Sequence, residues 1–217
     1  MKLLHLTLLA SFTLVSACSI LPKSEPSDVY RLPSAQSSAS ASHGTPQRWS
    51  LRLTKPQTSE ALNSPKIAVI PQGDLISNYK ASRWSDPAPV LLRNRLLDGF
   101  QRDGRVTLLS TDDSNFQADL ELGGSLQAFQ TEYQGTNASV VVRLDALLVR
   151  GYDQRILASR RFEVRQLLQV LWLAEEPVAD ADRAENAGKL RLEIAVIGAQ
   201  QCHPTITLET IQQTIAQ

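Results

Sequence analysis

The residue whose surroundings suggest the clearest chemistry is Cys18, one of only two cysteines among the 217 residues. It directly follows two small residues, Ser16 and Ala17, and before them the apolar Val15. A thiol is a nucleophile that can be alkylated, and small residues before it are typical of a peptidase cleavage site. Cys18 is therefore the first candidate for a covalent modification.

The residues before Cys18 have the composition of an export signal. Lys2 supplies a positive charge, and residues 3–15 form an apolar block that is too short to span a bilayer. The order apolar, small, small, cysteine resembles the bacterial lipobox, whose thiol receives diacylglycerol and whose new amino group receives a third acyl chain. Three chains anchor a protein essentially permanently, because each buried methylene contributes about 0.8 kcal/mol. The alternative is a plain secretory signal cleaved after Ala17, which leaves a free thiol.

Catalytic chemistry has little support in the sequence. Residues 47–166 contain no histidine and no cysteine, which removes most serine-triad, cysteine-protease and zinc-site hypotheses for this segment. Asp119 and Glu121 share one face of a predicted strand, but two solvated carboxylates are ordinary there. No phosphate-binding glycine loop occurs. The sequence predicts a protein that is not an enzyme and that has no cofactor and no metal site.

Composition and charge limit the classes of protein to which this chain can belong. Twenty-two basic and twenty-two acidic residues give a formal net charge of zero, which argues against a nucleic-acid partner. We divide the chain into a signal peptide (1–17), an acylated flexible tether rich in Ser, Ala and Pro (18–46), one domain (47–200) and an atypical tail (201–217). The tether would reach about 95 Å when taut.

Apolar periodicity predicts a mixed fold. Patterns typical of strands occur at 29–33, 49–53, 66–71, 106–109, 118–129, 140–148 and 156–164, the first of them as an edge strand within the tether. One helix is expected from its cap at Asp86 to a stop at Gly104, and Gly123-Gly124 predict a bulge. Residues 174–192 can be read as a second helix or, in part, as a strand. The predicted class is α/β (α+β mixed): a single domain whose mixed, largely antiparallel sheet carries one to two packed helices.

The stretch Tyr79–Asp86, YKASRWSD, joins a predicted buried strand to the helix and is interpreted as a connecting loop. It brings together Tyr79, Arg83 and Trp84, residue types that are favoured at the energetic centres of interfaces. Loops on a rigid scaffold often carry binding, so these three are the candidate partner-binding residues. The alternative is structural: Trp84 closes the core, and Arg83 stacks on an aromatic ring or pairs with a carboxylate.

Several motifs occur in an order that resembles one protein family. They are the lipobox, Tyr30-Arg31-Leu32, the buried Ile67–Pro71 strand, the Tyr79–Pro87 segment with its Arg-Trp pair, a helix and Ala118–Leu122. In this order they resemble the ABC-type transport auxiliary lipoprotein family. The resemblance covers about Cys18 to Gln166, and its most specific motif is the segment with the Arg-Trp pair.

The resemblance implies a non-enzymatic protein anchored in the outer membrane, on its periplasmic face. Its implied partners are an MCE-domain periplasmic protein and an inner-membrane transporter component, which together move lipids across the periplasm. Ser19 agrees with this address, because an aspartate after the cysteine would resemble an inner-membrane retention signal. PqiC-like members are implied to form homo-oligomeric rings that receive the end of an MCE tube. The alternative function is a periplasmic lipid carrier with a pocket between sheet and helix.

The sequence departs from the family pattern after Gln166. There the family continues into a long amphipathic C-terminal helix, whereas this chain reads LLQVLWL and ends in a tail that contains Cys202 and His203. One hypothesis is a shifted reading frame near residue 167, which resequencing of the gene would test. If the tail is not native-like, the helix expected to cover part of the sheet is lost and stability falls.

The predicted anchor can be tested with Cys18→Ser. Cells that express the wild-type chain should incorporate an alkyne fatty acid into it and retain it in the membrane fraction, because acyl chains partition into the bilayer. The variant should lose both the label and the membrane association. Labelling that persists in Cys18→Ser would contradict acylation at this sulfur.

Overall fold

The computed structural model describes residues 26–32, 46–135 and 137–168. The predicted signal peptide, Cys18, the ambiguous 174–192 segment and the predicted tail lie outside these residues. The elements are β1 (Asp28–Tyr30), β2 (Leu51–Leu53), β3 (Lys66–Gln72), β4 (Leu75–Trp84), α2 (Ala88–Asp103), β5 (Leu109–Thr111), β6 (Leu120–Gln134), β7 (Asn137–Arg150) and β8 (Ile156–Leu168).

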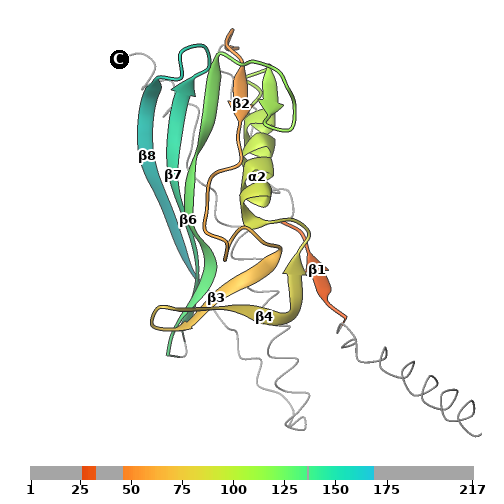
Figure 1. The fold of residues 1–217 in the computed structure, drawn as a ribbon, viewed down its shortest axis with the longest axis vertical. Helices are drawn as coiled ribbons and strands as arrows, with labels where there is room; N and C mark the ends of the chain where they lie inside the picture. The colour runs from red at the N-terminus through yellow and green to blue at the C-terminus, as the bar shows by residue number, and fades with distance from the viewer. Residues whose placement is uncertain (1–25, 33–45, 136, 169–217) are drawn as a thin grey trace, which may run out of the picture.

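The strands form one mixed sheet of eight strands in which β6 is central. β2 pairs in parallel with the start of β6 and β3 with its far end, whereas β7 runs antiparallel along its full length. The path β1-β4-β3-β6-β2-β5 is completed by β7 and β8. Figure 1 shows the long strands curling around α2, so that the sheet is a half-barrel with a single helix in the described part. The fold is therefore more sheet-dominated than predicted.

The predicted antiparallel meander is confirmed as β6, β7 and β8. Its alternation separates two faces, as a side-chain period of two requires. Leu144, Ala146 and Leu148 point into the core. On the other face, Arg143 and Asp145 form cross-strand ion pairs with β8. Arg143 lies 2.8 Å from Glu163, and Arg161 lies 2.6 Å from Asp145. These opposite-charge pairs fix the register between β7 and β8.

The core lies between α2 and the face of the sheet that it covers. Its buried side chains come from the helix and from five strands, which explains why one helix suffices to close this half of the sheet. The main contributors are Leu51, Leu53, Ile67, Trp84, Leu91, Leu92, Phe100, Leu122, Leu126, Phe129, Leu144 and Leu148.

The predicted helix is confirmed, but its predicted cap is wrong. Pro87 is the N-cap residue and no side chain caps the helix, while the Asp86 carboxylate accepts a hydrogen bond from the Ser85 hydroxyl at 2.9 Å. Proline needs no hydrogen-bond partner for its nitrogen, so the helix begins without a carboxylate cap. At the other end Gly104 has φ 72°, and its N–H donates to the carbonyl of Phe100 as a left-handed C-cap.

The strand predicted at 106–109 is displaced to Leu109–Thr111. Val106 makes only an isolated parallel bridge with Gln47, although it is 1% exposed. Its apolar character therefore reflects burial in the core and not membership of a strand.

The bulge predicted at Gly123-Gly124 lies further along β6, between Leu126 and Ala128. The two glycines keep their register with β7. Gly124 has φ 129°, and a Cβ there would lie 2.0 Å from the carbonyl oxygen of Asp145. Gly124 lets β6 and β7 approach each other closely. From the sequence alone, a glycine in this role cannot be distinguished from one that marks a bulge.

A buried cation ties α2 to the turn after β5. The Arg93 side chain is only 5% exposed, and its guanidinium pairs with Asp112 and, at 2.7 Å, with Asp113. Burial alone would raise the pKa of Asp112, but hydrogen bonds from the Arg93 side chain and the Lys55 backbone N–H outweigh it and lower that pKa. The ionised form of Asp112 is therefore the form that the fold stabilises.

We predict that Asp112→Asn destabilises the domain by about 2 kcal/mol at pH 7, because among the described residues it leaves the buried Arg93 with the more exposed Asp113 as its only carboxylate partner. A carboxylate with a lowered pKa contributes its stability above its ordinary pKa near 4 and loses it as the pH falls through the folded value. The difference between wild type and variant should therefore shrink below about pH 4.

Urea unfolding at pH 7 and pH 3 measures this difference. Asp113→Asn is the matched control, because this side chain is 59% exposed and its loss should cost under about 1 kcal/mol. Equal losses for both variants at pH 7 would show that Asp112 has no special role.

Candidate functional site

The segment Tyr79–Asp86, predicted as a connecting loop, belongs largely to strand β4. Both edges of β4 are paired: in register, Arg83 lies opposite Val29 of β1 on one side and opposite Lys66 of β3 on the other. The loop prediction was wrong because most of β4 is exposed on both faces, so its sequence lacks the alternation that marks a half-buried strand.

Within β4 the chain turns a corner. The single residue Ile67 of β3 faces the four residues 79–82 of β4, so three extra residues are accommodated as an irregular bulge. Ala81, in the middle of this bulge, has φ 50°, which non-glycine residues rarely adopt. Figure 1 shows β4 bending here to run beside β1. We call residues 79–84 the β4 corner.

Trp84 holds the corner to the core. Its side chain is 4% exposed, and its ring meets that of Phe129 edge to face with centroids 5.9 Å apart. Its backbone N–H donates to the carbonyl of Pro65 at 2.7 Å. Trp84 therefore closes the core, as the structural alternative predicted. Its buried indole can influence a partner only by fixing the shape of the corner.

Tyr79 ties the start of the corner to β6. It is half-buried, and its hydroxyl lies 2.8 Å from the hydroxyl of Tyr133. A shared hydrogen bond between two tyrosines on different strands, combined with the Trp84 contact at the other end, fixes both ends of the strained bulge.

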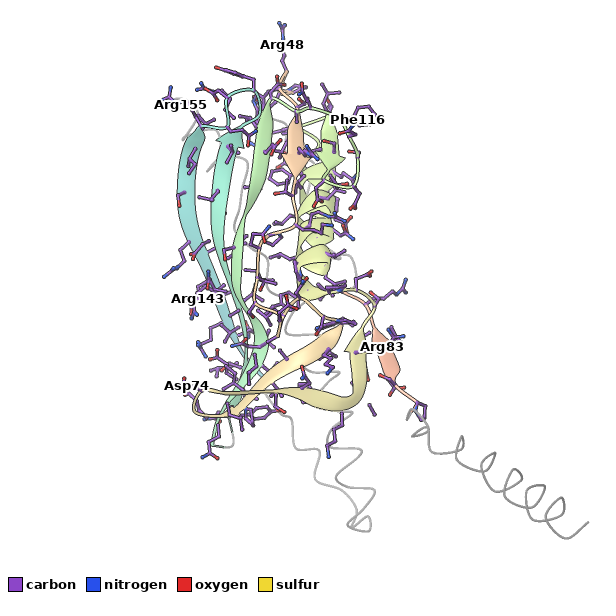
Figure 2. The ribbon with its side chains drawn as sticks, in the orientation of Figure 1. Arg48, Asp74, Arg83, Phe116, Arg143 and Arg155 are labelled. Atoms are coloured by element: carbon purple, nitrogen blue, oxygen red, sulfur yellow. The ribbon has the colours of Figure 1, made fainter. Side chains whose placement is uncertain are left out.

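Arg83 is the exposed member of the three candidate residues. Figure 2 shows its side chain reaching away from the sheet at the end of the molecule that carries β1. Within the described part of the chain it makes no ion pair, side-chain hydrogen bond or ring contact, so the predicted stacking or pairing is not seen there. The corner thus presents a guanidinium on a rigid strand, with its supporting aromatic residues behind it.

A small apolar recess with a cavity volume of about 20 Å³ lies behind the corner. It is bounded by residues of β3, β4, β6 and β7, with no contribution from α2. Its lining residues are Ile67, Ala68, Trp84, Phe129, Gln130, Thr131, Val140 and Val142. It therefore differs in place from the predicted pocket between sheet and helix.

The two carboxylates considered for acid/base chemistry have structural partners. Asp119 accepts hydrogen bonds from the backbone N–H and the hydroxyl of Ser50, which lower the pKa of Asp119. Glu121 lies 3.7 Å from Arg52. Both contacts join β2 to the start of β6. Nowhere in the described residues do three or more His, Cys, Asp or Glu side chains group in a way that could hold a metal ion.

The described residues form a small sheet-rich domain with a single helix. Residues 30–170 match the family model described as the ABC-type transport auxiliary lipoprotein component. The chain belongs to this family, as its sequence motifs indicated. The match ends close to Leu168, the last described residue.

One of two solved structures compared with the chain shares its fold. A crystal structure of a DUF330 protein from Xanthomonas campestris is 22% identical, covers 88% of this chain and 100% of its own, and has a TM-score of 0.60. The crystal structure of an uncharacterised protein is 15% identical, covers 81% of this chain and 99% of its own, and has a TM-score of 0.49. No curated protein matches the sequence.

Membership of the family identifies a transport auxiliary lipoprotein and points to a non-enzymatic role. Within the residues that the structure describes, no helix has the length and apolar character needed to cross a bilayer.

The strain at the corner can be tested with Ala81→Gly and Ala81→Val. Glycine tolerates positive φ, so Ala81→Gly should stabilise the domain by up to about 1 kcal/mol. Valine is β-branched and should destabilise it by more than about 1 kcal/mol. Urea unfolding gives both values.

The same two substitutions at Ser77, an exposed β4 residue before the corner, form the matched control. There the order should reverse, because glycine weakens an ordinary strand and valine favours it. An identical order at both positions would mean that Ala81 carries no strain.

Proposed function

We propose that this chain is a non-enzymatic lipoprotein held in the outer membrane, on its periplasmic face, through acyl chains on Cys18. It serves as an auxiliary component of an ABC/MCE-type lipid transport system. Its partners are an MCE-domain periplasmic protein and an inner-membrane transporter component, and it docks on the MCE protein through the β4 corner. Assembly as a homo-oligomeric ring belongs to the same proposal.

The observation that carries the docking proposal is the exposed Arg83 on a strand whose both edges are paired. Arginine is enriched at interface hot spots, because its planar fork binds carboxylates or carbonyls with little further loss of entropy. Trp84 and Tyr79 support it by fixing the corner from behind. Because the strand is already ordered, binding through Arg83 does not have to order the backbone as binding through a mobile loop would, and only the side chain loses conformational freedom.

The alternative, a periplasmic lipid carrier, has weaker support. Pockets that enclose small ligands measure about 300–1,000 Å³, whereas the cavity volume of the recess is about 20 Å³, which is room for about one water molecule. Mass spectrometry of protein that lacks Cys18 distinguishes the two functions. Lipid that co-purifies in stoichiometric amount would favour the carrier.

We expect Arg83→Ala to reduce capture of the MCE-domain protein by tenfold or more, as for a hot-spot residue. The measurement is pull-down from solubilised membranes with the full acylated chain, and the MCE protein is identified by mass spectrometry. Trp84→Ala is unsuitable, because removal of a buried indole should cost about 3–5 kcal/mol of stability and confuse folding with binding.

Arg155→Ala is the matched control. Arg155 has no ion pair within the described residues, and Figure 2 places it at the opposite end of the domain from Arg83. Its loss should leave capture unchanged. Capture that is also unchanged in Arg83→Ala would remove the β4 corner from the interface.

A further inference from the structure

Basic side chains without partners gather at one end of the domain. Eight of the described basic residues form ion pairs: Arg52, Lys55, Arg93, Arg105, Arg143, Arg150, Arg161 and Arg165. Six others make no side-chain ion pair, hydrogen bond or ring contact within the described residues: Arg31, Arg48, Lys66, Lys80, Arg83 and Arg155.

Four of these six lie at the β4 corner. Lys66 is opposite Arg83 in register, Lys80 lies within the corner, and Arg31 directly follows β1, which pairs with residues 82–84. All four are exposed. The other two, Arg48 and Arg155, lie at the opposite end in Figure 2. In a chain of zero net charge, the corner is therefore a local concentration of positive charge among the described residues.

Acidic residues at the same end balance this charge only in part. Asp28 of β1 lies opposite Ser82, and Asp86 follows the corner and accepts the Ser85 hydroxyl. Four cations thus face two carboxylates. Val29, between Asp28 and Tyr30, is 50% exposed and adds an apolar side chain to the same edge.

The anchor sequence enters the domain at this end. β1 begins at Asp28, ten residues after Cys18, so the chain between them spans at most about 35 Å. Because β1 pairs with β4, Cys18 can lie at most about 35 Å from the domain, about a third of the 95 Å predicted for a free tether. Because this link is short and joins the domain beside the β4 corner, the corner is the part of the domain nearest the anchoring lipids.

We propose that the β4 corner faces the leaflet that holds Cys18, and that Arg31, Lys66 and Lys80 contact anionic lipid headgroups there. Arg83 then meets its protein partner at the membrane surface. The proposal rests on the proposed function, because it assumes acylation of Cys18. Each basic residue at an anionic surface contributes roughly fivefold in affinity, and the effect is confined to about 10 Å by salt.

Energy transfer to the membrane tests this orientation. The full acylated chain, carrying Cys202→Ser, is reconstituted in vesicles of phosphatidylethanolamine and phosphatidylglycerol with an acceptor dye on the headgroups. A donor dye is attached at Val29→Cys or at Arg155→Cys, at the two ends of the domain. Transfer should be high from position 29 and at least severalfold lower from position 155.

The charge contribution is tested with the triple variant Arg31→Gln/Lys66→Gln/Lys80→Gln. Transfer from position 29 should fall in this variant, in high salt and in vesicles without phosphatidylglycerol. The double variant Arg48→Gln/Arg155→Gln, which removes the unpaired cations at the far end, is the control and should change nothing. Transfer that is unaffected by the triple variant and by lipid charge would overturn the headgroup contact.

A pair of insertions tests the role of β1. About fifteen Gly and Ser residues placed within 19–27 should lower transfer from position 29, because they lengthen the link between anchor and corner. The same insertion within 36–42 lies after β1 and should leave it unchanged. Equal effects of both insertions, or equal transfer from both dye positions, would overturn the orientation. Wild-type chain that does not associate with vesicles at all would instead refute the anchoring, and with it the proposed function.

Discussion

The structure depends on the way in which β6 divides one of its edges between two partners. β2 takes the first part and β3 the last, whereas β7 follows the other edge throughout. β2 and β3 both run parallel to β6, one beside its start and the other beside its end, and the twisted sheet curls around α2 (Figure 1). That curl creates the concave face that a single helix fills. It also places β3 and β4 clear of the helix, so that β4 remains exposed and available.

The β4 corner combines, in one short segment, side chains that stabilise the domain and a charged side chain that is exposed to solvent. Neighbouring side chains on a strand point to opposite faces, so Trp84 enters the core while Arg83 faces solvent. The indole and the Tyr79 hydroxyl hold the strained bulge from inside. The interface residue types singled out in the sequence therefore divide into one that presents charge and two that position it.

Much of the fold could be predicted from the sequence, because the meander and α2 carry clear periodicities of two and 3.6 residues. β4 could not, since it is held by pairing with β1 and β3, which periodicity does not report. The role of Gly124 was missed for a similar reason, because the oxygen that excludes a side chain there comes from Asp145, in the next strand. The lack of an ion-pair partner for Arg83 among the described residues is likewise a property of its neighbours in space, and only the residue types indicated the site.

The parallel pairing of β1 with β4 has a mechanical consequence. A pull exerted on the chain before Asp28 is borne first by three residue pairs, Asp28 with Ser82, Val29 with Arg83 and Tyr30 with Trp84. Force is transmitted directly into the strand that carries Arg83 and, through Trp84, to the hydrophobic core. An anchor on Cys18, as proposed above, would couple motion of the membrane to the corner through these few residue pairs.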